Sequence, residues 1–344
     1  MTRIIVTGNA GFIGFHLTKR LLDDGHEVLG IDGMTDYYDL QLKLDRLQQL
    51  EDYTNFRHVT SMLEDLASIQ TELADFDPDI IVHLAAQAGV RYSIENPDAY
   101  ISSNVHGTLR VLELARATKA RHLMIASTSS AYGGNIKMPF SESDTTRSPV
   151  SLYAATKLSS EALAHSFSHL WKIPTTCFRF FTVSGPWGRP DMALFKFVDA
   201  IEEGRPIDVY GFGKMRRDFT YIDDLVESVR NLMDAVPEQA QQRSEHDTVS
   251  PIAPYRIVNI AGGSPTELME FVDAVEQAMN AKAEINLMPM QPGDVVATWA
   301  EPALLRDLIG STPETSVVDG VRHFVDWHRE YFAQRRRAEQ VVSA

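Results

Sequence analysis

A three-glycine turn near the start of the chain constrains its fold more than any other feature. A strand-like run at residues 4–6 leads directly into Gly8-x-x-Gly11-x-x-Gly14, and residues 15–24 have the apolar spacing of a helix. A second strand-like run then ends in Asp32. This strand–helix–strand unit predicts a doubly wound α/β fold with a parallel sheet, in which ligands bind at the carboxyl ends of the strands.

Each glycine has its own physical role in a dinucleotide site. Gly8 allows a tight turn, Gly11 lets backbone N–H groups approach a pyrophosphate, and Gly14 lets the helix lie close to the strand. Asp32 can accept hydrogen bonds from both ribose hydroxyls of an adenosine and would repel a 2′-phosphate. Gly33 stands where an NADP enzyme more often has Arg. The motif therefore predicts a Rossmann domain that binds NAD rather than NADP, in preference to a purely structural turn.

Residues able to do chemistry follow two later strands. The small-residue turn at residues 85–89 would let a flat cofactor pass over the backbone, and four consecutive hydroxyls, residues 127–130, end the next strand. Tyr153 and Lys157 share a face of the helix that follows. Hydroxyl clusters are most often loops or caps, and Tyr-x-x-x-Lys is common on solvated helices. Together at one sheet edge, they instead indicate a proton relay around a carbinol.

The sequence pattern changes at residue 184, which we take as the start of a second unit. We expect a Rossmann domain at residues 1–183 with a return segment at about 219–262. A smaller α/β substrate-binding lobe is expected from residues 184–218 and 263–335, and a frayed tail from 336–344. A basic cluster (Lys214, Arg216, Arg217) is either a solvated face or a diphosphate clamp. Residues 237–254 are predicted to form an exposed insertion.

Composition narrows the function classes. With 32 basic and 47 acidic side chains the net charge is −15, which argues against nucleic acid or an anionic membrane as the main partner. The single cysteine, Cys177, gives no disulfide framework and no thiolate metal site, so no metal is expected. No apolar run approaches the ~20 residues that span a bilayer, and the start of the chain does not resemble a signal peptide. A cytoplasmic enzyme is the expectation.

With these motifs in hand, the chain resembles the extended short-chain dehydrogenase/reductase superfamily and, within it, the NAD-dependent UDP-glucuronate 4-epimerases. The closer resemblance rests on residues 83–93, 180–197, 217–224 and 291–294. It implies a homodimer with tightly held NAD that interconverts UDP-glucuronate and UDP-galacturonate. The sugar would be oxidised at C4, would rotate as a 4-keto intermediate and would be reduced on its other face.

The resemblance also implies residue roles. Tyr153 would be the catalytic base, Lys157 would bind the nicotinamide ribose and lower the Tyr pKa, and Thr128 would bond the 4-oxygen. It implies cofactor contacts from Gly8, Gly11, Phe12, Ile13, Gly14, Asp32, Leu63, Leu84, Ala85, Ala86, Gln87, Asn104, Ser127, Tyr153 and Lys157. The implied substrate residues are Ser129, Ser130, Thr182 and Arg189 at the sugar carboxylate, Arg217 and Asp294 at UDP, Thr128 at the sugar, and Arg91 and Ser93 near cofactor or substrate.

Two positions depart from the family pattern. Met62 stands near a position where many relatives have an Asp that receives the adenine amine, and Ser184 stands where many have Tyr. Alternatives remain open as well. A decarboxylase that forms UDP-xylose would place a Glu near the hydroxyl cluster, but the next acid here is Glu142. A 4-epimerase of neutral UDP-sugars such as UDP-glucose and UDP-galactose, or a non-catalytic NAD-binding scaffold, would also fit parts of the pattern.

Overall fold

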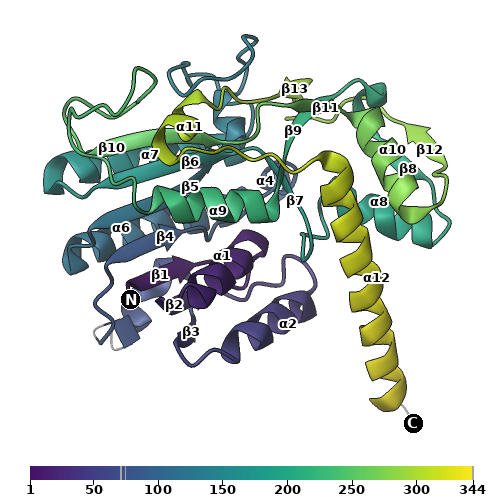
Figure 1. Ribbon diagram of the computed structural model, residues 1–344, viewed down its shortest axis with the longest axis horizontal. Helices are drawn as coiled ribbons and strands as arrows, with labels where there is room; N and C mark the ends of the chain where they lie inside the picture. Colours follow the sequence, from purple (N-terminus) through teal and green to yellow (C-terminus); the bar gives the residue numbers. More distant parts are fainter. Residues whose placement is uncertain (70–71, 74, 343–344) are drawn as a thin grey trace.

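A seven-stranded parallel sheet forms the centre of the computed structural model, which describes residues 1–69, 72–73 and 75–342 (Figure 1). The strand order is β10-β6-β5-β4-β1-β2-β3, and every neighbouring pair is parallel. The strands are β1 (Arg3–Thr7), β2 (Glu27–Asp32), β3 (Phe56–Thr60), β4 (Ile80–His83), β5 (His122–Thr128), β6 (Thr175–Phe180) and β10 (Tyr255–Ile260). The order reverses between β1 and β4, and ligands of doubly wound sheets bind at such a reversal. The predicted fold class is confirmed.

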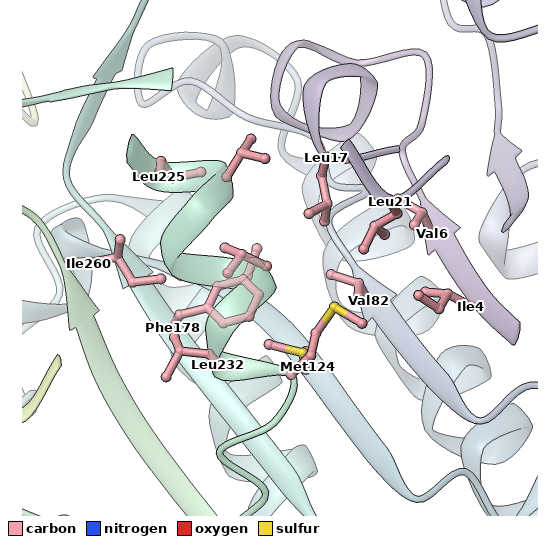
Figure 2. Close-up of a cluster of buried hydrophobic side chains, with 14 of the residues drawn as sticks. Ile4, Val6, Leu17, Leu21, Val82, Met124, Phe178, Leu225, Leu232 and Ile260 are labelled. Carbon is pink, nitrogen blue, oxygen red and sulfur yellow. The ribbon is translucent and has the colours of Figure 1, made fainter. Parts of the chain in front are cut away.

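Helices cover both faces of this sheet (Figure 1). One face carries α1 (Phe12–Asp23), α2 (Leu40–Glu51), α9 (Ile222–Leu232) and α11 (Ala303–Ile309), and the other carries α6 (Gly107–Thr118) and α7 (Leu152–Trp171). In β1, Ile4 belongs to the first core and Ile5 to the second, because successive side chains of a strand alternate. Figure 2 shows the first core, where leucines of α1 and α9 meet Met124 and Phe178 of the sheet. Burial on both faces explains the near-continuous apolar runs of the strands.

A second group of elements lies beside the carboxyl ends of the central strands. Its larger sheet has the order β11-β9-β13, with β7 also paired to β9, and β8 pairs with β12. The bounds are β7 (Thr182–Ser184), β8 (Ile207–Val209), β9 (Arg216–Tyr221), β11 (Pro265–Glu267), β12 (Ile285–Leu287), β13 (Ala297–Thr298), α8 (Ala193–Glu202), α10 (Leu268–Met279) and α12 (Val317–Val342). Phe195, Phe271 and Phe324 anchor a separate core there. The short elements are η1 (Leu63–Ile69), α4 (Tyr92–Glu95), α5 (Pro97–Tyr100), η2 (Ile101–His106), η3 (Ser129–Tyr132) and η4 (Tyr210–Gly213).

Several expected boundaries fall differently in the structure. β9 begins at Arg216 and pairs within the second sheet, although residues from 219 were expected in the Rossmann return segment. α11 packs its Leu304 and Leu305 into the core on the central sheet, although it lies in the stretch expected to form the second lobe. α12 runs without interruption to Val342, so residues 336–342 are helical rather than frayed.

No helix in the described part of the chain is long and apolar enough to cross a membrane.

The segment at residues 237–254 is largely exposed, as expected for an insertion, but one buried side chain ties it to the central sheet. Asp247 is fully buried and accepts two hydrogen bonds from Arg256 of β10, from Nε at 2.7 Å and from Nη2 at 2.9 Å. A buried charge pair with this bidentate geometry compensates the desolvation of both groups. The polar composition of the segment predicted exposure because it could not show this partner.

The buried face of α2 includes two charged side chains. Lys43 and Arg46 are buried together with Leu47, whereas Leu40 and Leu44 are exposed. The Arg46 guanidinium donates to the carbonyl oxygens of Ala10 and Trp187, at 2.9 and 2.7 Å. These acceptors pair both terminal nitrogens of the guanidinium, where an apolar residue would leave the carbonyls unpaired. α2 thereby connects the glycine turn to the loop that precedes α8.

Candidate functional site

A single cavity of about 1180 Å³ lies at the carboxyl ends of β1, β2, β4 and β5 and extends to the second group of elements. The glycine turn and Asp32 line one end of it. Tyr153, Lys157 and the hydroxyl cluster line its middle, and α8, β9 and the loop before β13 line the other end. A cavity of this size and length can hold two nucleotide-sized ligands end to end.

Gly8 and Gly14 occupy positions where a side chain would collide with backbone. Gly8 has φ +78° and faces the chain after β4, where an added Cβ would lie 2.8 Å from the backbone nitrogen of Ala85. A Cβ on Gly14 would lie 1.9 Å from the carbonyl oxygen of Gly8. Gly11 is the N-cap of α1 and provides no side-chain cap. The first N–H groups of α1 are therefore available to an anion, as a pyrophosphate site requires.

Asp32 ends β2 beside this turn, as the motif predicts. Its carboxylate accepts hydrogen bonds from the backbone N–H groups of Ala10, at 3.2 Å, and Met34, at 2.8 Å. Lys43 Nζ lies 3.9 Å from Asp32 Oδ1 and donates to Thr35 Oγ1 at 3.1 Å. Lys43 lines the same cavity but was not among the predicted site residues. A single lysine on a polar helix gives no signal of a site, because its partners Asp32 and Thr35 lie on other segments.

Tyr153 and Lys157 lie on successive turns at the start of α7. The Ser151 hydroxyl caps this helix by accepting from the N–H of Ala154 at 3.1 Å. Lys157 is buried, and its Nζ donates to the carbonyl oxygen of Ala126 in β5 at 2.8 Å. Burial lowers the pKa of Lys157 to about 8. Thr128 ends β5 at the same level, where its Oγ1 accepts from the N–H of Ser130 at 3.1 Å.

The phenol of Tyr153 is not activated by the protein alone. Burial raises its pKa above the ordinary value, while a hydrogen bond with Thr128 and the positive charge of Arg189 act in the opposite direction. The Lys157 ammonium is hydrogen-bonded to a backbone carbonyl, so it is held in the wall of the cavity. A further positive charge beside the phenol would be needed for it to act as a base near neutral pH.

A buried charge pair supports this wall from behind. The Glu161 carboxylate, one helical turn after Lys157, accepts from Nε and Nη2 of Arg179 in β6 at 2.9 and 2.7 Å. It also accepts from the Ser127 hydroxyl at 2.5 Å. Because Ser127 precedes Thr128, the pair fixes the end of β5 against α7. Such bonds around a site hold the reacting groups in one geometry.

Arg189 lines the cavity together with the hydroxyl side chains of Ser129, Ser130 and Thr182. Arg189 Nε donates to Asp191 Oδ1 at 2.9 Å, and Nη2 donates to Asp191 Oδ2 at 2.5 Å. Three hydroxyl side chains and one guanidinium form a donor set suited to a carboxylate.

The far end of the cavity carries the arginines expected at UDP. Arg217 donates from Nη2 to the carbonyl of Val295 at 2.8 Å, and Arg91 lies 3.6 Å from the Asp294 carboxylate and over the ring of Tyr210. Arg217 lines the cavity, whereas its neighbour Arg216 points outward and pairs with Glu267. Because successive side chains of β9 alternate, Arg217 faces the cavity, as a diphosphate clamp requires, and Arg216 belongs to a solvated face.

All but two of the predicted site residues line this cavity. The residues that it brings together are Gly8, Gly11, Phe12, Ile13, Gly14, Asp32, Leu63, Leu84, Ala85, Ala86, Gln87, Arg91, Ser127, Thr128, Ser129, Ser130, Tyr153, Lys157, Thr182, Arg189, Arg217 and Asp294. Asn104 and Ser93 are the two exceptions, because both are buried and do not line the cavity. Asn104 bonds the N–H and the carbonyl oxygen of Gln87, and the Ser93 hydroxyl donates to the carbonyl of Val90. They shape the wall rather than line it.

Residues 4–260 match the family model described as the NAD dependent epimerase/dehydratase family. The chain belongs to this family. It is 55% identical to a probable UDP-glucuronate 4-epimerase of Rhizobium meliloti (strain 1021) over 99% of this chain and 100% of the relative. It is also 40% identical to UDP-glucuronate 4-epimerase 1 of Arabidopsis thaliana, over 98% of this chain and 79% of that one.

Among solved structures, this epimerase/dehydratase family member is similar to the UDP-glucuronic acid 4-epimerase of Bacillus cereus in complex with UDP-glucuronic acid and NAD. The TM-score is 0.85 at 31% sequence identity, covering 96% of this chain and 99% of the other.

Met62, one of the two departures from the family pattern, lines the cavity next to Asp32. Its sulfur lies against Gly33, where an added Cβ would be 2.3 Å from it.

Proposed function

We propose that this protein interconverts UDP-glucuronate and UDP-galacturonate by transient oxidation at C4, with NAD as a bound cofactor. The observation that carries the proposal is one cavity with Tyr153 and Thr128 at its middle and Arg189 among three hydroxyls beside them. A proton acceptor and a carboxylate-binding set are thus placed around one sugar-sized space. Membership of the family and the likeness to named UDP-glucuronate 4-epimerases support the same reaction.

The residues present fit NAD. The glycine turn leaves space only for backbone, and the uncapped N-terminus of α1 suits a pyrophosphate. The Asp32 carboxylate suits the adenosine ribose, and the side chains of Tyr153 and Lys157 reach the nicotinamide end of the cavity. When bound there, NAD supplies the hydride acceptor for C4 oxidation and the hydride donor for the return step.

In the reaction, Tyr153 takes the proton of the sugar 4-hydroxyl, and Thr128 holds the 4-oxygen in place. With NAD bound, the positive charge of the site would lower the phenol pKa that burial raises in the protein alone. Lys157 would orient the ribose from its position in the wall, and Tyr153 returns the proton to the 4-oxygen after the sugar has turned its other face. Arg217 and Arg91 hold the diphosphate while the sugar turns about it.

The acid group of the sugar decides between related reactions. A 4-keto glucuronate is a β-keto acid, which loses CO2 when its C5–carboxylate bond stands perpendicular to the carbonyl plane. Arg189 and the hydroxyls of Ser129, Ser130 and Thr182 would hold that bond away from perpendicular. Glu142, the first acid after the hydroxyl cluster, does not line the cavity, and its carboxylate accepts from the N–H of Asn259 at 2.8 Å. This arrangement favours epimerisation over decarboxylation.

The test is to supply UDP-glucuronate without added NAD and to follow the sugar signals by NMR. The expected product is UDP-galacturonate, formed until the two sugars reach a constant ratio, and the same ratio should be reached from UDP-galacturonate. UDP-xylose with CO2 would show a decarboxylase instead. Turnover of UDP-glucose to UDP-galactose at a higher kcat/KM than that of UDP-glucuronate would show an epimerase of neutral sugars.

We also propose that the protein is a cytoplasmic homodimer that supplies polysaccharide biosynthesis. The exposed Leu170 and Trp171 at the end of α7 support a contact through α6 and α7, because apolar side chains gain from burial between subunits. Light scattering after gel filtration should give about twice the chain mass of 38.5 kDa. A monomer mass at micromolar concentration would exclude the dimer, and cell fractionation tests the compartment.

A further inference from the structure

Asp191 holds Arg189 by one particular edge of its guanidinium. The hydrogen bonds run from Nε and Nη2, which form the side edge, and both carboxylate oxygens of Asp191 take part. These two bonds do not use Nη1, which lies on the other edge of the guanidinium. Because an arginine has five N–H groups in a fixed planar fork, a partner on the side edge leaves the end edge, Nη1 with Nη2, free for a second carboxylate.

A third residue fixes the Asp191 carboxylate from a distant part of the chain. The Tyr37 hydroxyl, on the loop after β2, donates to Asp191 Oδ2 at 3.3 Å. The ring of Tyr37 packs on that of Tyr92, with centroids 4.9 Å apart. Gly89 lies against this assembly, since a Cβ there would be 2.9 Å from the Tyr37 oxygen and 3.8 Å from Arg189 Nη2. Three separate loops thus determine where the guanidinium lies.

Arg189 and Asp191 are only partly buried, so the contact between them decides whether the guanidinium is ordered before a ligand binds. The Arg189 and Asp191 side chains are 21% and 26% exposed. Without Asp191, the guanidinium could turn toward solvent along its flexible stem, and each ligand would have to order it again. With Asp191 in place, the cation is ordered before the sugar arrives, and the pair as a whole is neutral toward an uncharged sugar.

We propose that Asp191 is a positioning residue that aims the end edge of Arg189 at the acid group of the sugar, and thereby sets the preference for hexuronates over neutral sugars. This inference rests on the proposed function, because it assigns Asp191 to the same sugar site. A merely structural role for Asp191 would affect acidic and neutral sugars alike. Repulsion between Asp191 and the sugar carboxylate is the opposing effect, which solvent screens at this exposure.

The experiment measures binding of UDP-glucuronate and UDP-glucose by calorimetry to the NAD-loaded protein. A Tyr153→Phe background prevents turnover during the titration. Asp191→Ala is expected to weaken UDP-glucuronate about tenfold and to leave UDP-glucose within about twofold. Asp191→Asn keeps the shape and one acceptor, so its expected loss is about threefold. Asp36→Asn is the matched control, because it removes an exposed carboxylate from the segment that carries Tyr37 and should change neither affinity.

The decisive arm repeats Asp191→Ala in an Arg189→Ala background. There, loss of Asp191 should have no further effect on UDP-glucuronate, because the group that it positions is already absent. Equal weakening of both sugars, an additive effect in the double variant, or tighter UDP-glucuronate binding by Asp191→Ala would each overturn the proposal. The proposed reaction is judged separately by the NMR assay on the unaltered protein, so the two can fail independently.

Discussion

The two ends of the cavity recognise their ligands by different means. At the glycine turn the recognition surface is backbone, and the residues that form it lie within a few positions of each other, from Gly8 to Gly14. At the sugar end it consists of charged side chains whose partners come from remote segments, as when Tyr37 bonds Asp191 and Arg91 lies beside Asp294. The first surface tolerates no added atom, whereas the second can be adjusted one charge at a time.

This difference separates what all ligands of the fold need from what one substrate needs. A dinucleotide pyrophosphate is the same in every enzyme that binds it, so rigid backbone suits it. A sugar acid differs from a neutral sugar by one charged group, and side-chain pairs can discriminate that difference. Tyr153, the proposed base, lies between the two surfaces and depends on both.

The largest effect is expected at the backbone surface. Gly14→Ala should destabilise the fold by about 3 kcal/mol or more, since its Cβ would overlap the carbonyl of Gly8, and little dinucleotide should copurify. Gly11→Ala is milder, with a contact of 3.1 Å to the same oxygen, and should retain the fold while weakening NAD. Gly134→Ala is the control, because its nearest contacts are at 3.9 Å. Thermal unfolding and the absorbance of released dinucleotide measure both quantities, and a wild-type result for Gly14→Ala would contradict the comparison.

The next effect is expected where the two surfaces meet. Tyr153→Phe should reduce kcat by about 10²–10⁴-fold, the usual contribution of a general acid–base group, while NAD and UDP-glucuronate still bind. The ring that packs at 6.2 Å against Tyr100 is kept, so folding should be unaffected. Single-turnover NMR with UDP-glucuronate gives the rate. Turnover close to that of the unaltered protein would mean that another group accepts the proton.

The sequence predicted the backbone surface well for a physical reason. The glycine spacing, the strand before it and Asp32 after it all lie within 32 residues, and local sterics determine their geometry. The same holds for Tyr153 and Lys157, which one helix places on one face. The hydroxyl cluster at residues 127–130 followed from its position at the end of a strand, because parallel strands bring their carboxyl ends to one edge, while the resemblance singled out Thr128 within it.

The charged partnerships were not predictable in the same way. Lys43 and Arg46 are buried on α2, although hydrophobicity alone ranks Leu40 and Leu44 above them as buried residues. Their burial depends on acceptors such as the carbonyl of Trp187, which lies 141 positions away along the chain. Asn104 shows the same dependence, since the resemblance implied a position near cofactor or substrate while the fold buries its side chain in bonds to Gln87. A pattern in one sequence records which residues are polar and does not record which group each one meets.

The comparison of the two ends of the cavity also predicts that the Glu142 carboxylate takes no part in the reaction. Glu142 is close in sequence to the hydroxyl cluster but outside the cavity, and burial raises its pKa from 4.5 to about 7. Between these two pH values the folded protein binds more protons at Glu142 than the unfolded chain does, so this residue makes stability fall as the pH rises through that range.

Glu142→Gln keeps an acceptor for the N–H of Asn259 and removes the charge. It should therefore stabilise the protein by about 2 kcal/mol at pH 8 and by less than about 1 kcal/mol at pH 5, with kcat unchanged. Urea unfolding at the two pH values, with the exposed Glu238→Gln as control, measures the difference. Loss of epimerase activity in Glu142→Gln would move this acid into the site and reopen the decarboxylase reading, because the acid that such enzymes keep near their hydroxyls would then have a counterpart here.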